Sequence, residues 1–236
     1  MNIIFRNAVF VVALFLSINS FAQTDGLGTW DFFYGKVNLN KKWFLFLEPH
    51  LFAQKVKHDF NYYEYNAGVG YNLPKNIILS FAVGHYSTYQ SDGDFKLPLL
   101  NNEFRVWEQI ATTNFIGRLK IEQRYRLEQR YTSASGYRNR FRFRVNAVLP
   151  LNHKVLTAKT LYLASSDEIF ITNEQPFFEQ NWLFIGLGYQ VSPHLAFHAG
   201  WLNRLNQSIN HDTYWKNYFQ TACIFAIDVY KKHPIS

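Results

Sequence analysis

Charged residues recur at every second position along one stretch of the chain, from Arg118 to Arg144. Apolar, aromatic and glutamine residues fill most of the positions between them, and a short polar segment with one glycine, Gly136, interrupts the run. The charged positions are Arg118, Lys120, Glu122, Arg124, Arg126, Glu128, Arg130, Arg138, Arg140, Arg142 and Arg144. A period of two puts such residues on one face of a β-strand, whereas a helix would spread them around its axis. The pattern therefore predicts two long strands joined as a hairpin.

The two faces of this hairpin favour a membrane-spanning barrel. Like charges that face each other on neighbouring strands are destabilising, and a soluble sandwich has no need for them. A transmembrane barrel requires an apolar outer face and accepts charges in a polar lumen, provided that carboxylates interleave with the arginines. Residues 118–130 would extend ~40 Å as a strand, or roughly 30 Å across a bilayer at a tilt near 45°. The alternative is a long antiparallel hairpin in water.

The same alternation continues through most of the chain. Besides the hairpin, strands are expected at 30–38, 43–54, 62–72, 77–89, 103–113, 155–171, 181–191, 195–201 and 214–229, with tight turns near 39, 74, 115, 152 and 192. This gives eleven strands, but bacterial barrels have even numbers. We therefore favour about twelve, with one strand unrecognised near the N-terminus or in the polar loop 90–101; ten is possible if the first segment lies outside the wall. The predicted fold is all-β: a single closed antiparallel transmembrane barrel with an up-and-down meander.

Carboxylates on several predicted strands are placed to neutralise the arginines in the lumen. The expected lumen charge lattice consists of Glu48, Glu64, Glu103, Arg105, Arg118, Lys120, Glu122, Arg124, Arg126, Glu128, Arg130, Arg138, Arg140, Arg142, Arg144 and Glu168. One interpretation is a structural plug, in which arginine forks bridge glutamates across the lumen. The other is a narrow porin-like channel whose arginine ladder prefers anions. The alternation also places Glu108 on the lipid-facing side, where a charge is costly.

Composition narrows the class of protein. The chain has 236 residues, 19% of them aromatic, and a formal net charge of +7, with eight of the eleven arginines between positions 118 and 144. Because this basic face belongs to a strand pattern that includes glutamates, and no nucleic-acid motif is visible, we expect no nucleic acid as a partner. The single cysteine, Cys223, excludes an intramolecular disulfide and a multi-cysteine metal site.

The first residues resemble an export signal. Arg6 supplies a positive charge, residues 8–16 form a short apolar core, and Ser20-Phe21-Ala22 precedes Gln23 as a small-x-small cleavage site would. We therefore expect a signal peptide at residues 1–22 and the barrel at 23–236, exported to the outer membrane of a double-membraned bacterium with outer-membrane lipid around it.

Catalytic chemistry has weak support in the sequence. No catalytic, cofactor-binding or metal-binding residues are predicted, and no cofactor is expected, because the histidines are scattered without metal-ligand spacing and no Gly-x-Ser-x-Gly motif occurs. The pairs worth considering for a barrel lipid hydrolase or an acyltransferase-like enzyme are His85 with Ser87 and His198 with Asn203. Whether the protein is an enzyme stays open, with a non-enzymatic role favoured.

The order of several short motifs resembles the family called domain of unknown function 2490, which comprises outer-membrane β-barrels. The resemblance runs over nearly the whole mature chain: Trp30; Lys42-Trp43 leading to Glu48; Gly68-Val69-Gly70-Tyr71; Glu103-Phe104-Arg105 leading to Glu108-Gln109; the run 124–130; Arg140-Phe141-Arg142-Phe143-Arg144; and Gln180-Asn181 before Gly186-Leu187-Gly188-Tyr189. Where the resemblance leads us to expect an arginine after Asn181, this chain has Trp182. It implies a fold and a location and no reaction.

The expected role is that of a structural barrel or a narrow anion-preferring channel; the alternative is an outer-membrane lipid hydrolase. Small anionic solutes are the expected ligands of a channel, and protein partners are not indicated.

Overall fold

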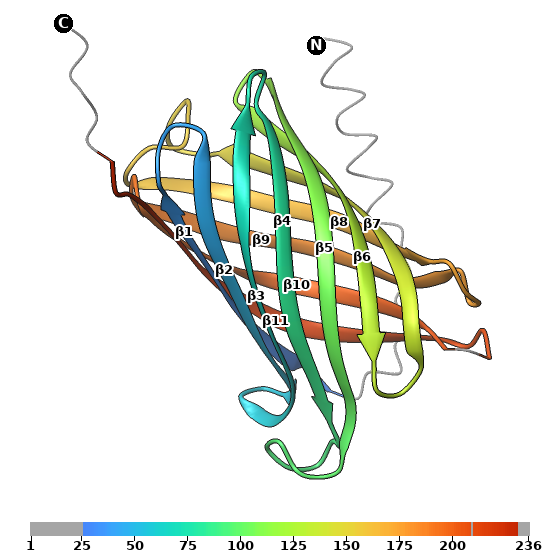
Figure 1. Cartoon of the computed structure of the whole chain (residues 1–236). Helices are drawn as coiled ribbons and strands as arrows, with labels where there is room; N and C mark the ends of the chain where they lie inside the picture. Colours follow the sequence, from blue (N-terminus) through green and yellow to red (C-terminus); the bar gives the residue numbers. More distant parts are fainter. Residues whose placement is uncertain (1–25, 209, 231–236) are drawn as a thin grey trace, which may run out of the picture.

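The computed structural model describes residues 26–208 and 210–230, so the expected signal peptide at residues 1–22 lies outside the described residues. The described chain forms eleven strands that close into one barrel (Figure 1). The strands are β1 (Gly28–Asn38), β2 (Trp43–Lys55), β3 (His58–Leu73), β4 (Ile77–Tyr89), β5 (Leu99–Ile116), β6 (Leu119–Thr132), β7 (Gly136–Pro150), β8 (Thr160–Thr172), β9 (Phe178–Ser192), β10 (Leu195–Gln207) and β11 (Thr213–Asp228). The all-β closed barrel predicted from the sequence is confirmed.

The barrel closes through a parallel pair of strands. Each strand pairs antiparallel with its neighbour in sequence, but β1 and β11 run in the same direction, from Gly28 beside Tyr218 to Asn38 beside Asp228. An odd number of strands in an up-and-down meander leaves the first and last strands parallel. Here β1 pairs in parallel with β11 along the whole length of β1. The described residues therefore contain eleven strands where twelve were favoured: loop 90–98 adds none, and the first segment lies in the wall.

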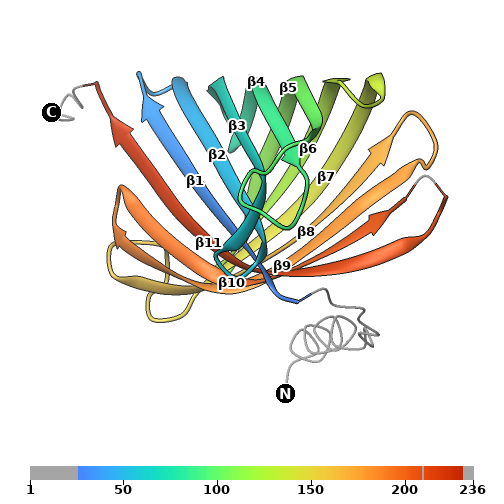
Figure 2. The ribbon, with the colours of Figure 1, turned by 90° about the horizontal axis from the view of Figure 1, so that it is seen from below.

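The five predicted turns all lie at one end of the barrel, which we call the turn end (residues 39–42, 74–76, 117–118, 151–159 and 193–194). The opposite end, which we call the loop end, carries residues 56–57, 90–98, 133–135, 173–177, 208 and 210–212. In Figure 1 the turn end is at the top, and Figure 2 views the barrel from the loop end.

One connection at the turn end is longer than predicted. The expected strand 155–171 begins only at Thr160, because side-chain hydrogen bonds fix the preceding residues as a loop. Asn152 Nδ2 donates to the Lys159 carbonyl at 2.9 Å, and the Thr157 backbone N–H donates to Thr160 Oγ1 at 3.0 Å. Such local bonds compete with strand pairing. Residues 151–159 are therefore a loop, where a tight turn near 152 was expected.

The wall has an apolar outside and a polar or aromatic inside. Phe81, Leu187 and Phe219 on the outer face are 45–53% exposed, whereas Glu128 on the inner face is 0% exposed. Glu108 faces outward, as its position in the alternation predicted, and accepts a hydrogen bond from Gln129 Nε2 at 3.1 Å. In the described part of the chain no helix is long and apolar enough to cross a membrane.

Aromatic side chains fill much of the lumen. One buried cluster joins Trp30, Phe52, Tyr162, Phe184, Leu202 and Tyr218, and a second joins Phe44, Phe46 and Trp107. Tryptophan in a membrane barrel is typical of an interfacial girdle, but Trp30 and Trp107 are 2% and 1% exposed and lie inside the barrel. The alternation gives the side on which a ring lies, but not whether it anchors the protein at an interface or fills its core.

Inward glycines make space for these rings. A Cβ at Gly70 would overlap the Phe44 ring, and one at Gly188 would overlap the Tyr162 ring. At these two positions the absence of a side chain on one strand therefore accommodates an aromatic ring from the neighbouring strand.

Candidate functional site: a charge lattice across the lumen

The lattice arises from the register of β6 against β7. This register places Arg124 opposite Arg144, Arg126 opposite Arg142, and Glu128 opposite Arg140. Two of these three pairs bring like charges face to face, which is unfavourable unless carboxylates lie between them. The structure supplies those carboxylates from other parts of the wall.

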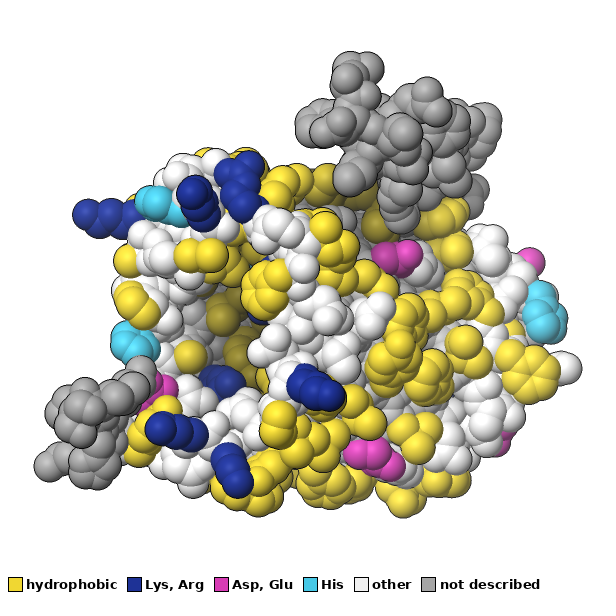
Figure 3. Space-filling view, turned by 90° about the horizontal axis from the view of Figure 1, so that it is seen from above, with side chains coloured by type: hydrophobic (Ala, Val, Ile, Leu, Met, Phe, Trp, Pro, Cys, Tyr) yellow, Lys and Arg dark blue, Asp and Glu magenta, His cyan; other side chains and the backbone are white. Residues whose placement is uncertain are grey.

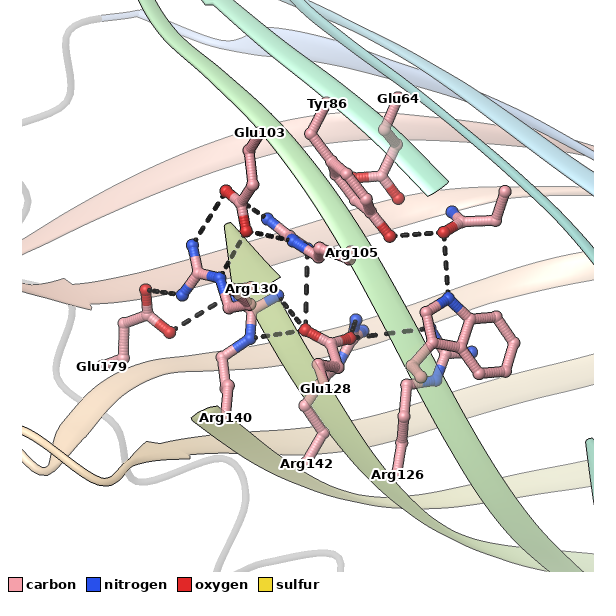
Figure 4. A network of polar contacts seen from close by, with 12 residues as sticks. Glu64, Tyr86, Glu103, Arg105, Arg126, Glu128, Arg130, Arg140, Arg142 and Glu179 are labelled. Atoms are coloured by element: carbon pink, nitrogen blue, oxygen red, sulfur yellow. Dashed lines mark hydrogen bonds and ion pairs between the residues drawn. The ribbon is translucent and has the colours of Figure 1, made fainter. Parts of the chain in front are cut away.

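Glu128 is the centre of the lattice. Its side chain is fully buried and has arginine nitrogens on several sides: Arg140 Nη2 at 2.6 Å, Arg142 Nη1 at 2.8 Å, Arg105 Nη1 at 3.6 Å and Arg126 Nη1 at 3.8 Å. These arginines come from β5, β6 and β7, and Figure 4 shows them converging on the one carboxylate. Charge-assisted bonds of this kind are the strongest hydrogen bonds in proteins. One carboxylate therefore links three neighbouring strands.

Toward the loop end, two glutamates hold the next arginines. Glu103 accepts from the Nε atoms of Arg105 and Arg130, each at 2.5 Å. Glu179 contacts Arg130 Nη1 at 2.9 Å and Arg140 Nη1 at 3.0 Å, with Arg138 Nη2 at 3.6 Å. Glu179 lies on β9, and its contacts are with arginines of β6 and β7, so the lattice extends beyond the hairpin strands (Figure 4).

Glu179 was not among the residues predicted for the lattice, because it precedes the expected strand 181–191; continued alternation would also place it on the outer face with Asn181. The register between β8 and β9 shifts between Phe170 and Ile171, so that Gln180 and Phe178 face consecutive residues of β8. A β-bulge of this kind inserts one residue and redirects its side chain. Glu179 is the inserted residue and reaches into the lumen.

Toward the turn end, Glu168 on β8 bridges two arginines. It pairs with Arg124 Nη2 and accepts from Arg142 Nε at 2.8 Å. Arg144 Nη2 lies 3.4 Å from Glu122 Oε1. The ion pairs become fewer in this direction.

Aromatic faces hold the arginines as well. The guanidinium carbon of Arg126 lies 3.7 Å from the Trp107 ring centroid, and that of Arg105 lies 3.5 Å from the Tyr86 ring centroid. A guanidinium group stacks well on an aromatic face, so these contacts fix each fork without requiring another carboxylate.

Most residues predicted for the lattice do line the lumen. Arg118 is the exception: it lies exposed in the turn between β5 and β6, because β6 begins at Leu119, one residue later than the alternation suggested. Lys120 lines a cavity near the turn end, Glu48 lies 3.9 Å from Arg126 Nη2, and Glu64 lies 3.6 Å from His50 Nε2.

Trp182 occupies the position at which the family resemblance suggested an arginine. Its ring packs edge-on against Trp30 at 4.5 Å between centroids. Arg204, its partner in register on β10, has its guanidinium carbon 5.6 Å from the Trp182 ring centroid. The lumen thus has an arginine beside this position, on the neighbouring strand.

Three spaces lie along the interior of the barrel, and residues of the lattice line each of them. A cavity of about 440 Å³ lies on the turn side and one of about 280 Å³ on the loop side, while the space among Glu48, Arg126 and Glu168 is about 90 Å³.

The two histidine pairs singled out in the sequence differ in the structure. His85 Nε2 lies 3.1 Å from Ser87 Oγ, on the outer face of β4. His198 and Asn203 lie on opposite faces of β10: His198 stacks near Phe184 inside, and Asn203 donates to Asn217. The second pair is therefore not a site, since five residues along a strand reverse the face. Among the described residues, no group of three or more His, Cys, Asp or Glu side chains is arranged to hold a metal ion.

These features define a small closed β-barrel that is apolar outside and carries a buried arginine–glutamate lattice inside. The chain belongs to the family described as a protein of unknown function, DUF2490, whose model matches residues 27–215. The match begins just before β1 and ends within β11, so it covers nearly the whole wall. No curated protein and no solved structure matches the chain.

Proposed function

We propose that this protein is an outer-membrane barrel whose lumen is closed by its charge lattice, with a structural rather than a conducting role. The membrane location is supported by the wall. Each described strand has 11–18 residues, enough to cross a bilayer at a tilt, and large apolar side chains are exposed on the other strands from β2 to β11, though not on β1. A soluble monomer rarely exposes so much apolar surface.

The observation that carries the closed lumen is the environment of Glu128. A carboxylate in an open aqueous pore keeps its water, whereas this one is 0% exposed and its contacts are arginine nitrogens. The arginines beside it are also buried, Arg126 to 3% and Arg140 to 4% exposed. Because these arginines and Glu128 pair with one another and not with water, they do not form a row of hydrated charges along which an ion could pass.

The aromatic cluster supports closure on the other side of the lumen. Trp30, Phe52 and Tyr218 come from β1, β2 and β11, which lie across the barrel from β6 in strand order. Their rings pack at 4.1–6.3 Å between centroids. Charged forks on one side and packed rings on the other leave between them a space of only about 90 Å³.

Conductance of the refolded mature chain in planar bilayers tests this proposal. Heat-modifiable migration in electrophoresis would first establish that the sample is a folded barrel. We expect no steady single-channel steps. Steady anion-selective steps that vanish or invert in Arg126→Glu and Arg142→Glu would contradict a closed lumen and establish a narrow anion-preferring channel instead.

The contact between His85 and Ser87 favours a second candidate, a lipid hydrolase on the outer wall. The 3.1 Å between His85 Nε2 and Ser87 Oγ is a separation at which a general base can activate a serine nucleophile. The ring of His85 also lies beside Tyr65, at 5.4 Å between centroids. The structure gives this pair no carboxylate or amide to orient the histidine, and for that reason we rank it second.

Hydrolysis of a fluorogenic phospholipid in mixed micelles tests the second candidate. If Ser87 is a nucleophile, Ser87→Ala abolishes turnover while Ser80→Ala, on the inner face of the same strand, leaves it unchanged. Equal rates in both variants and in the unaltered protein would exclude the pair as a catalytic site.

A further inference from the structure

The cavity at the turn end is chemically two-sided. It has a volume of about 440 Å³, within the ~300–1,000 Å³ of small-molecule sites. Figure 3 views the turn end and shows a hollow in which hydrophobic and basic side chains are both visible. This space is separate from the fully paired centre of the lattice.

One side of the cavity is apolar. It is formed by Phe32 on β1, Phe184 on β9 and Ile224 on β11, with Ala196 and Ala226 between them. Phe32 and Phe184 also stack around His198, at 5.6 and 5.2 Å between ring centroids. This side offers a surface for a ring or a short acyl chain.

The other side is basic. Lys120, Arg124 and Arg144 line it from β6 and β7, which lie across the barrel from β1 and β11 in strand order. Lys36 lines the cavity from β1, the strand that also carries Phe32, with its Nζ 3.9 Å from the Phe44 ring centroid. The lining therefore contains four lysine or arginine side chains.

Two carboxylates line the same cavity, and arginines already hold both. Glu122 lies 3.4 Å from Arg144 Nη2, and Glu48 lies 3.9 Å from Arg126 Nη2. Glu168, which neutralises Arg124, is shared with Arg142. The cavity consequently has more positive than negative charge.

Donor groups remain unused on the basic side. The Nε atoms of Arg124 and Arg144 are buried and have no hydrogen-bond partner, and the Arg124 residue is only 6% exposed. A buried N–H group without a partner is costly and uncommon in folded proteins. These two arginines face each other directly in the β6–β7 register, so an anion between them would also relieve their repulsion.

We propose that the turn-end cavity binds a small amphipathic carboxylate, with its carboxylate at Arg124 and Arg144 and its apolar body against Phe32 and Phe184. A carboxylate matches the fork of an arginine, and the apolar side distinguishes this ligand from an inorganic anion. The inference goes beyond the closed-lumen proposal and does not depend on it, since the cavity lies on one side of the lattice.

Isothermal titration calorimetry on the barrel in phosphatidylcholine nanodiscs tests the site, with empty nanodiscs as the blank. The probes are 3-phenylpropionate and octanoate, which distinguish an aromatic from an acyl body, together with 3-phenylpropan-1-ol and acetate. We expect one-site binding of at least one of the two amphipathic acids. Binding of the alcohol and of acetate should be at least tenfold weaker, because the alcohol lacks the carboxylate and acetate lacks the apolar body.

Two variants and a matched control locate the site. Arg124→Gln and Arg144→Gln should each weaken binding about tenfold, the loss expected for one charge-assisted bond. Arg138→Gln is the control: Arg138 lies on the same strand and face as Arg144, and its Nε also lacks a partner, but it is roughly 20 Å away along the strand. Arg144 is less buried than Arg124, so its variant serves if Arg124→Gln does not refold.

Three results would overturn the inference. The first is the absence of saturable binding of either acid to the folded barrel. The second is equal affinity for the acid and its alcohol, which would indicate partition into an apolar space. The third is a loss of affinity in Arg138→Gln as large as in Arg144→Gln, which would indicate a general charge effect. None of these results depends on conductance, so the cavity proposal and the closed-lumen proposal can be refuted independently.

Discussion

Removal of the charge on Glu128 is the most direct test of the lattice as a stabilising element. Glu128→Gln keeps the size of the side chain but leaves four buried arginines without their shared carboxylate. Breaking a buried ion pair by removing one partner costs ~3–5 kcal/mol, because an uncompensated charge stays buried. The structure indicates a value near the lower limit, about 3 kcal/mol.

The reason for the lower value is that the two arginines closest to Glu128 each have a second acceptor. Arg140 keeps Glu179 at 3.0 Å, and Arg142 keeps Glu168 at 2.8 Å. The amide introduced by Glu128→Gln would also retain one carbonyl oxygen as an acceptor, although its N–H groups would face other donors.

Urea unfolding of the barrel in lipid vesicles, followed by tryptophan fluorescence, measures the effect through linear extrapolation. Glu122→Gln is the control, because Glu122 is partly exposed and has one ion pair, at 3.4 Å; we expect a loss of at most ~1 kcal/mol for it. If Glu128→Gln unfolds within ~0.5 kcal/mol of the unaltered protein, or no more easily than Glu122→Gln, the reasoning from burial is refuted.

Three further changes test other parts of the structure. Glu179→Gln should lower the free energy of unfolding by ~2–3 kcal/mol in the same urea assay, because its carboxylate holds arginines from two strands; an effect under 0.5 kcal/mol would mean that the bulge does not place it in the lumen. Gly188→Ala should cost ~1–3 kcal/mol through overlap with the Tyr162 ring, and Tyr162→Leu in the same chain should recover part of it; additive losses would argue against the contact. If the barrel lies in a membrane as proposed, Glu108→Leu should raise stability in vesicles by about 1 kcal/mol, since a carboxylate that faces lipid is costly. A loss of stability would place this part of the wall outside the hydrocarbon.

The side on which each residue lies could be predicted from the sequence, but its partner could not. Alternation placed Glu103, Arg105 and Trp107 together on the inner face, and the structure confirms it. The ion pair between Arg124 and Glu168 joins residues two strands apart, and nothing in the period of either strand encodes it. Such pairs depend on which strands are neighbours around the barrel and on how far an arginine reaches across it.

Local interruptions of the strands account for the remaining differences. Glu179 enters the lumen because one inserted residue changes the alternation, and Arg118 leaves it because the chain turns there. The parallel closure of β1 on β11 follows from the number of strands, and alternation carries no information about direction at the seam. A prediction from period alone is therefore reliable inside a strand and fails where a strand ends, bulges or closes the sheet.

The sizes of the inward residues explain why the lumen is filled at its centre and hollow near the turns. About eight strands enclose a space that side chains just fill, so a barrel of eleven needs long side chains wherever it is to be closed. At the central level the inward residues are arginine, glutamate, tryptophan and tyrosine, which reach across and meet. Closer to the turns several of them are small: Ser80, Ala111, Ala164, Ser166 and Ala196 line the turn-end cavity beside its larger residues. The same alternation of inward residues thus produces a closed level and, beside it, a space of the size that a small ligand requires.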